Sequence, residues 1–201
     1  MRRFLIVILK DKKLIFLHIP KNAGKSVEIF LTGKTVGNPH EKDWRIRNQL
    51  AAGKYSDYFS FGVIRNPIDR LMSVFNHYKG GGVGIQHDKN VQRALKNTTF
   101  DEFVDQIDEY KGKLISNYML GNQYRWFFDD DLQIVTKILI FSKLPDNIIE
   151  IGKLFDITRG FPWENRSKKF VNIKDVKDST IIKIYKRYKK DFDVIKGTCR
   201  A

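Results

Sequence analysis

The chain has little cysteine and no long apolar run. Its 201 residues include one cysteine, Cys199, which excludes an internal disulfide and a cysteine-rich zinc site. The four histidines, at positions 18, 40, 77 and 87, lack the spacing of metal ligands, so we expect no metal. The apolar run at 4–9 has six residues, too few for a membrane span or a typical signal sequence. We therefore expect a cytoplasmic protein without stable membrane insertion; the sequence does not indicate its oligomeric state.

Acidic residues are also in deficit. Asp and Glu number 23 against 37 Lys and Arg, which gives a net charge of +14. Such a surplus favours anionic partners, namely nucleotide cofactors, nucleic acid, acidic glycans or anionic lipid, although a solvated lysine-rich surface is equally consistent with it. The apolar fraction of 42% predicts a folded globule. Since no linker of Pro, Gly and Ser divides the chain, we expect a single domain over residues 1–201.

Strand and helix patterns alternate along the chain. Helices are expected directly after Gly24 and at 43–52, 67–78, 99–110, 146–155 and 179–195, and strands at 3–9, 14–19, 59–64 and 132–141. This alternation predicts an α/β fold with a mainly parallel sheet flanked by helices. The glycine-rich segment 79–88 is predicted to be a loop over a site. In the last helix, five side chains are expected to face inward: Ile181, Tyr185, Tyr188, Phe192 and Ile195.

The stretch HIPKNAGKS, residues 18–26, joins a predicted strand to a predicted helix. A helix N-terminus offers unpaired N–H groups and partial positive charge, so it binds phosphate or sulfate readily. Its last three residues match the end of a nucleotide-binding P-loop, but Ile19 stands where that motif begins with glycine. The residues expected to hold an anion are Lys21, Asn22, Ala23, Gly24, Lys25 and Ser26.

A second strand–turn–helix unit spans residues 58–78, with Arg65 at its turn. Asn66 is a favourable N-cap and Pro67 suits the first helical position. Ligands of parallel α/β sheets bind at the carboxyl ends of the strands. The basic groups of the two turns are therefore expected to converge on one anion.

Both turns resemble those of the family 2 sulfotransferases, which include the carbohydrate sulfotransferases similar to heparan sulfate 2-O-sulfotransferase. FLHIPKNAGKS is similar to the family's hydrophobic-HIPK-x-x-G-T-S turn, and FGVIRNPIDRLMSVFNHY to its F-x-x-x-R-N-P-x-x-R-L-x-S-x-x-x-x-Y segment. Weaker similarity continues to the C-terminal part of the chain. The resemblance implies that the first turn holds the 5′-phosphosulfate of 3′-phosphoadenosine 5′-phosphosulfate (PAPS), and that Arg65 and Ser73 hold its 3′-phosphate. The chain departs from the family at Lys25, where threonine is usual.

The resemblance also implies the chemistry: sulfuryl transfer from PAPS to an acceptor hydroxyl, most readily on a glycan, leaving 3′-phosphoadenosine 5′-phosphate (PAP). No metal, second cofactor or nucleic acid is implied. Lys21 in the turn suits stabilisation of the leaving group. The base histidine that the resemblance implies is His40, with His87 and Glu41 as rivals. Position and charge alone suggest that Arg166, in the basic loop 161–169, closes over the 3′-phosphate or the purine.

Two other classes of protein stay open. A P-loop NTPase or small kinase would hold Mg²⁺ with Ser26, but the residue at 19 and the Arg-Asn that ends the second strand count against it. A nonenzymatic binder of nucleic acid or anionic glycans would need basic residues interleaved with exposed aromatics. QYRWFF and YKRYKK offer a little of that pattern. The acceptor itself is open, and a hydroxyl outside carbohydrates is consistent with the sequence.

Overall fold

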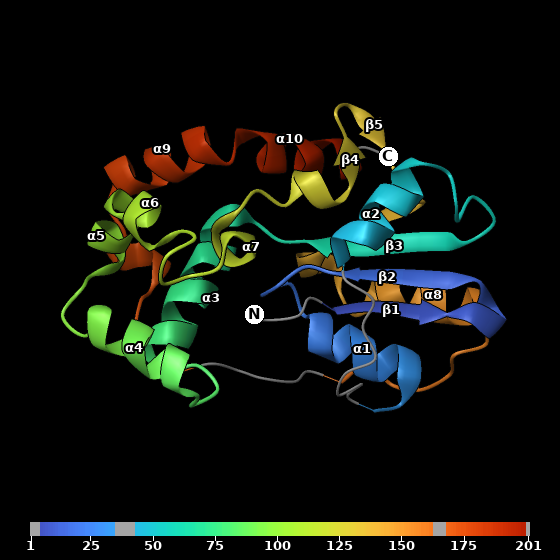
Figure 1. The fold of residues 1–201 in the computed structure, drawn as a ribbon, viewed down its shortest axis with the longest axis horizontal. Coiled ribbons are helices and arrows are strands. Elements are labelled where there is room, and N and C mark those ends of the chain that lie inside the picture. Colours follow the sequence, from blue (N-terminus) through green and yellow to red (C-terminus); the bar gives the residue numbers. More distant parts are fainter. Residues whose placement is uncertain (1–4, 35–42, 163–167, 200–201) are drawn as a thin grey trace. The chain divides into compact units, whose positions relative to one another are not determined.

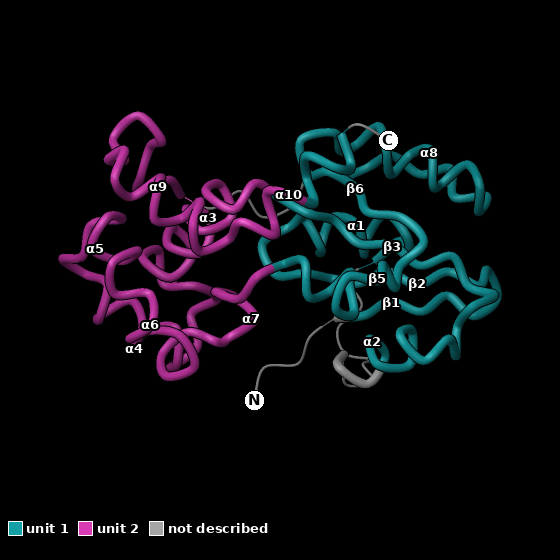
Figure 2. The backbone as a smooth tube through the Cα atoms, turned by 90° about the horizontal axis from the view of Figure 1, so that it is seen from above, with its two compact units in different colours: residues 1–65, 123–164, 194–201 teal, residues 66–122, 165–193 magenta. Residues whose placement is uncertain are grey.

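The structure, a computed structural model, describes residues 5–34, 43–162 and 168–199. The chain divides into two compact units, coloured separately in Figure 2. Unit 1 comprises Met1–Arg65, Gln123–Glu164 and Val194–Ala201, and unit 2 comprises Asn66–Asn122 and Asn165–Asp193. We describe each unit by itself. The expected single domain over 1–201 thus stays a prediction.

Unit 1 contains the main sheet (Figure 1). Its strands, in spatial order, are β1 (Leu5–Leu9), β2 (Leu14–His18), β3 (Phe59–Ile64) and β6 (Lys137–Ile140). β1 is antiparallel to β2, whereas the β2–β3 and β3–β6 pairs are parallel. The α/β class with a mostly parallel sheet is therefore confirmed.

The strand expected at 132–141 is wrong in its extent. Its first part forms β5 (Leu132–Gln133), which pairs with β4 (Phe128–Asp129) in a separate antiparallel hairpin. Thr136 then begins the return to the main sheet, where its N–H donates to the Ser60 hydroxyl over 3.1 Å. This apolar run thus contributes one strand to each of two sheets, because β5 pairs with β4 and β6 pairs with β3.

Helices cover both faces of the main sheet. One face packs on α1 (Gly24–Thr32) and α8 (Asp146–Leu154), with Phe16 and Phe61 among the strand residues in that cluster. The other face packs on α2 (Asp43–Ala51), on the 3₁₀ turn η2 (Tyr124–Trp126) and on Ile195 of α10 (Lys189–Thr198). Alternating strand residues supply the two clusters, as the period of two requires. Two short 3₁₀ turns complete the unit: η1 (Lys10–Lys12) and η3 (Phe141–Lys143).

Unit 2 is built from helices. They are α3 (Pro67–Lys79), α4 (Gln86–Ala94), α5 (Phe100–Asp105), α6 (Ile107–Tyr110), α7 (Asn117–Leu120), the turn η4 (Ile173–Asp175) and α9 (Asp178–Arg187). The N-cap prediction at Asn66 is confirmed: its side chain accepts from the N–H of Ile68 over 2.9 Å. Leu71 and Phe75 of α3 are buried in the core of this unit.

Three local predictions about the helices need correction. The segment 79–88 is a loop only as far as Ile85, because α4 begins at Gln86. The helix expected at 99–110 is divided into α5 and α6. The last helix is divided at Tyr188, and Tyr185 of α9 is 48% exposed, not inward as expected, while its neighbour Ile184 is buried. None of the helices within the described ranges has the length and apolar character needed to cross a membrane.

Candidate anion-binding site

The first turn has an unusual backbone. Lys21 and Ala23 both adopt left-handed conformations, with φ of 69° and 59°. Side chains with a Cβ disfavour this region by about 1 kcal/mol or more, so the surrounding fold must enforce it. Ala23 is the N-cap of α1, and a methyl group cannot accept a hydrogen bond from the first helical turn. The turn therefore presents main-chain N–H groups at the positive end of a helix, as an anion site requires.

Gly24 is required for packing against His18. A Cβ at Gly24 would lie 1.8 Å from atoms of the His18 ring, so any other residue would displace that ring. The ring also stacks on Phe16, with centroids 6.0 Å apart. The sequence placed this glycine among the residues expected to hold an anion. The structure shows a second reason why position 24 requires glycine: the His18 ring fills the space that a side chain would occupy.

Arg65 and Lys21 lie together, as the sequence predicted. The Arg65 guanidinium donates from Nη1 to the main-chain oxygen of Lys21 over 3.0 Å and lies 4.2 Å from the centroid of the Phe141 ring. Burial, and then the charge of Arg65, lower the pKa of Lys21 to about 8. Within the described ranges no carboxylate forms an ion pair with Lys21. Two cations are thus held close together, an arrangement that a bound anion would stabilise.

A buried network of amides connects the two turns. Asn22 donates from Nδ2 to the main-chain oxygen of Val63 and to Oε1 of Gln123, both over 2.6 Å. The same Oε1 accepts from the N–H of Arg65 over 3.0 Å, and Gln123 Nε2 donates to the Arg65 oxygen over 2.8 Å. The sequence reasoning missed Gln123, whose only signal was its place in the weakly similar NQYRWFF stretch.

Glu28, in the second turn of α1, was also missed. Its side chain is buried, and its Oε1 has no hydrogen-bond partner among the described residues. Burial raises the pKa of this carboxyl group, while the charge of Lys25 opposes the shift. A polar residue on the core side of a helix breaks the apolar pattern, and that break is a signal the sequence did contain.

The other predicted site residues lie on three different helices or outside the described residues. Ser26 is buried in the first turn of α1, and Lys25 is exposed beside it. Ser73 is half-buried on α3 and belongs to unit 2, whereas Arg65 belongs to unit 1. His87 is exposed on α4 and does not lie in a loop. Outside the described residues lie three more: His40, Glu41 and Arg166.

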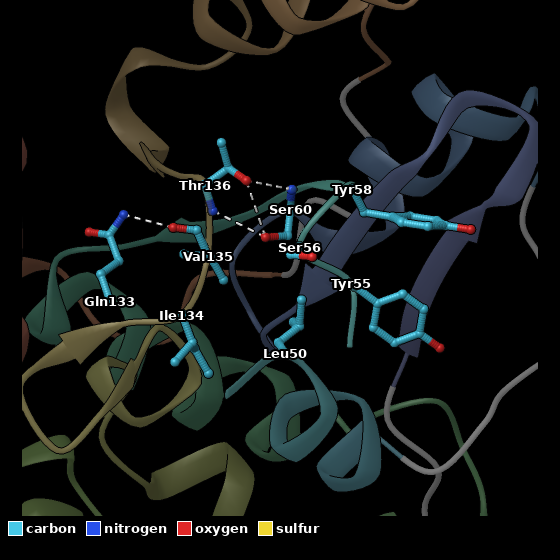
Figure 3. Close-up of a pocket in the computed structure, with 9 residues that line it drawn as sticks. All are labelled: Leu50, Tyr55, Ser56, Tyr58, Ser60, Gln133, Ile134, Val135 and Thr136. Carbon is cyan, nitrogen blue, oxygen red and sulfur yellow. Dashed lines mark hydrogen bonds between the residues drawn. The ribbon is translucent and has the colours of Figure 1, made fainter. Parts of the chain in front are cut away.

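A cavity of about 230 Å³ in unit 1 lies away from these turns (Figure 3). Ser60 near the start of β3 and Thr136 just before β6 both line it, so it opens at the amino ends of these strands. The N–H of Ser60 donates to Thr136 Oγ1 over 3.0 Å, and the reverse bond is also formed. Since these groups serve strand pairing, and the basic turns follow the carboxyl ends, we do not include this cavity in the candidate site.

Comparison with known proteins identifies the family. The model described as the sulfotransferase family matches residues 5–195, nearly the whole chain and parts of both units. The protein therefore belongs to the sulfotransferase family, as the two turns predicted, and its class of reaction is sulfuryl transfer to a hydroxyl-bearing acceptor. Searches of curated proteins and of solved structures gave no match.

Proposed function

We propose that the protein transfers a sulfuryl group from PAPS to a carbohydrate hydroxyl, with residues 1–201 acting as one sulfotransferase domain. The observation that carries the proposal is the junction of Lys21 and Arg65 at the N-terminus of α1, inside a chain of this family. A donor with a 5′-phosphosulfate and a 3′-phosphate supplies the negative charge that such a junction favours. The turn is P-loop-like in its helix start and its Gly-Lys-Ser end, although it lacks the opening glycine.

The residues present fit this donor. The first turn would hold the 5′-phosphosulfate through main-chain N–H groups, with Lys21, Lys25 and Ser26 adding charge and a hydroxyl. In the proposal, Arg65 faces the 3′-phosphate, since a guanidinium matches phosphate geometry. Two more residues would complete that subsite: Ser73 and Arg166.

The proposed step is an in-line displacement at sulfur. The acceptor oxygen bonds to sulfur as the bond from sulfur to the bridging oxygen breaks, and the electron pair stays with the phosphate of PAP. Lys21 in its ammonium form would stabilise that developing charge. We assign the acceptor's proton to His40, since an imidazole in its neutral form can accept a hydroxyl proton near physiological pH. Because Lys21 has a pKa of about 8 without an anion, donor binding would raise its pKa and keep it charged at neutral pH.

The acceptor we propose is an anionic glycan. The net charge of +14 supports it, because steering of an acidic polymer follows from a large opposite charge. A basic pocket of about 340 Å³ in unit 2 supports it further. Its lining residues are Lys79, Gln92, Arg93, Lys96 and Phe170. Cations beside an exposed aromatic ring suit a sugar that carries carboxylate or sulfate groups.

A thermal-shift comparison tests the donor. Adenosine 3′,5′-bisphosphate should raise the melting temperature of the wild type, because a ligand of the native state stabilises it. Arg65→Ala should lose most of that shift, whereas Arg125→Ala, an exposed arginine of the same unit, should keep it. A shift with ATP and Mg²⁺ alone would contradict the proposal and favour the P-loop NTPase class.

A further inference from the structure

The amide of Gln123 takes the place of a strand neighbour. β2 pairs with β3 only as far as Leu17↔Gly62, and beyond that register side-chain amides meet the main chain. The Asn22 side chain donates to the main-chain oxygen of Val63. The Gln123 side chain accepts from the N–H of Arg65 and donates to its main-chain oxygen. A primary amide offers the same donor and acceptor as a peptide group, so it can continue a ladder where the strand has ended.

We propose that Gln123 is a positioning residue of the donor site, fixing the main chain of Arg65 and, through Asn22, the first turn. This inference rests on the proposed function, since it names what sets the spacing of the two cations in the site. The closed set of contacts runs from Gln123 to Arg65, from Arg65 Nη1 to the oxygen of Lys21, and from Asn22 back to Gln123. Each of these hydrogen bonds has a donor–acceptor distance of 3.0 Å or less.

Because Gln123 is buried, its hydrogen bonds strongly constrain the positions of Arg65 and of the first turn. The side chain has no exposed surface, and Asn22 is 1% exposed. Buried polar groups must find partners inside the protein, and losing one partner strands the others. Removing the Gln123 amide would take a hydrogen bond from three groups at once: the Asn22 Nδ2 donor, whose other bond goes to Val63, and both main-chain groups of Arg65.

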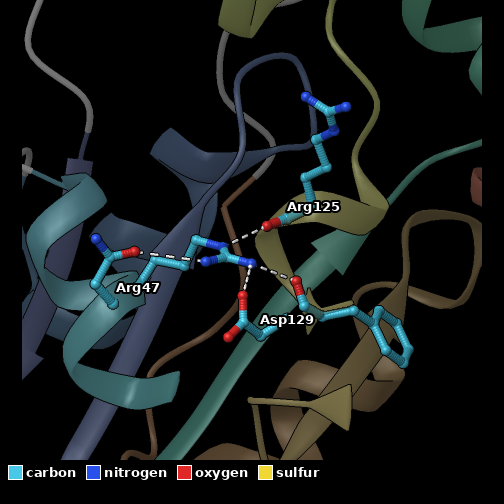
Figure 4. Close-up of polar contacts among 5 residues, drawn as sticks. Arg47, Arg125 and Asp129 are labelled. Atoms are coloured by element: carbon cyan, nitrogen blue, oxygen red, sulfur yellow. Dashed lines mark hydrogen bonds and ion pairs between the residues drawn. The ribbon is translucent and has the colours of Figure 1, made fainter. Parts of the chain in front are cut away.

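The segment that carries Gln123 is itself anchored. Arg47 of α2 is 7% exposed and donates from Nε to the main-chain oxygen of Arg125 over 2.7 Å. Its Nη2 donates to the oxygen of Phe128 over 2.6 Å and pairs with Asp129 at 3.0 Å (Figure 4). Gln123 therefore extends from a fixed stretch of chain, which lets its amide impose a position on Arg65.

The test uses Gln123→Met, which keeps the length of the side chain and removes the amide. Gln133→Met is the matched control, because Gln133 is exposed and its side-chain amide donates to the nearby main-chain oxygen of Val135, away from the first turn. If Gln123→Met fails to fold, Gln123→Glu serves instead, since it keeps both acceptor contacts of Oε1 and loses the donor to Arg65. Two properties are measured on the full chain: the dissociation constant of adenosine 3′,5′-bisphosphate, and the pH profile of Lys21 acetylation by limiting acetic anhydride, followed by peptide mass.

The proposal expects weakening of bisphosphate binding by at least about tenfold in the Gln123 variant, in a protein that still unfolds cooperatively. It also expects the acetylation midpoint of Lys21 to rise above about 8, because the charge of Arg65, which lowers the pKa of Lys21 in addition to burial, is no longer held beside it. The Gln133 control should change neither property. A folded Gln123 variant with an unchanged midpoint would overturn the inference. Lack of bisphosphate binding by the wild type would overturn the proposed function instead, since the Lys21 profile needs no ligand.

Discussion

Units 1 and 2 both bury polar side chains, but the burial serves different ends. In unit 2, Arg70 is 1% exposed and donates to the main-chain oxygens of Gly121 and Tyr118 over 2.9 and 2.7 Å. The Tyr188 hydroxyl donates to the oxygen of Leu120 over 2.7 Å, and burial raises the pKa of this phenol to about 12. These side chains hold one short stretch of chain around α7, and their contacts are internal to the fold.

In unit 1 several buried polar groups lie around the first turn, and some of their atoms are unpaired among the described residues. Lys21 has a lowered pKa, Glu28 has a raised one, and Asn22 Oδ1 and Glu28 Oε1 have no hydrogen-bond partner among the described residues. Groups in such environments cost stability in the absence of a ligand. In unit 2, therefore, the buried polar contacts stabilise the fold. In unit 1, the buried polar groups around the first turn lower the stability of the protein, and they lie where an anion is proposed to bind.

The largest effect on stability is expected in unit 2, from Arg70→Met. The substitution leaves two main-chain carbonyl groups without the donors they have now, and buried groups of this kind are expensive to strand. We expect a loss of about 3 kcal/mol or more in the free energy of unfolding, measured by urea denaturation. Arg93→Met, an exposed arginine of the same unit, is the control and should change little. A similar loss in both variants would show that the buried contacts of Arg70 are not what stabilises unit 2.

A smaller effect of the opposite sign is expected in unit 1, from Lys21→Met. The folded-state pKa of Lys21 is about 8 and its ordinary value is 10.5, so the unfolded chain binds the proton more tightly. The charged lysine therefore destabilises the fold fully below pH 8, and this penalty fades as the pH rises from 8 to 10.5. Lys21→Met should be more stable than the wild type at pH 7 by about 1–2 kcal/mol, with the difference shrinking above pH 8.

The same variant should lose bisphosphate binding and sulfuryl transfer, because it removes the charge that faces the donor. Unfolding curves at pH 7 and pH 10 measure the stability arm, and Lys25→Met supplies an exposed lysine of the same turn as a control. A Lys21→Met protein that is less stable than the wild type at both pH values would show that Lys21 belongs to the structural class found in unit 2.

Sequence patterns predicted those helices and strands whose formation depends on nearby residues. A short, mostly apolar run and a good N-cap predicted β3 and the start of α3, because both are determined by nearby residues. α4 was missed because its sequence, QHDKNVQRA, has one buried apolar residue, Val91, and follows a run of glycines. The break at Tyr188 was missed because the helical stripe continues through it in the sequence, while the backbone does not.

The charged residues of the site could be predicted from the sequence, whereas the amide side chains that position them could not. Lys21 and Arg65 each follow a strand, and neighbouring parallel strands end at the same edge, so their approach could be predicted. Gln123 is 58 residues from Arg65 and 101 from Asn22 along the chain. No local period connects such distant positions, and only the folded chain shows that the amides meet.

The most direct test of the central claim is calorimetry of adenosine 3′,5′-bisphosphate binding at pH 8, repeated in buffers with different ionisation enthalpies. At this pH Lys21, with a pKa of about 8, is half protonated, and an anion beside it would complete its protonation. The account predicts uptake of roughly half a proton per ligand bound by the wild type, and no uptake by any residual binding to Lys21→Met. Tight binding to the wild type without proton uptake would contradict the claim that the donor's anion lies against Lys21.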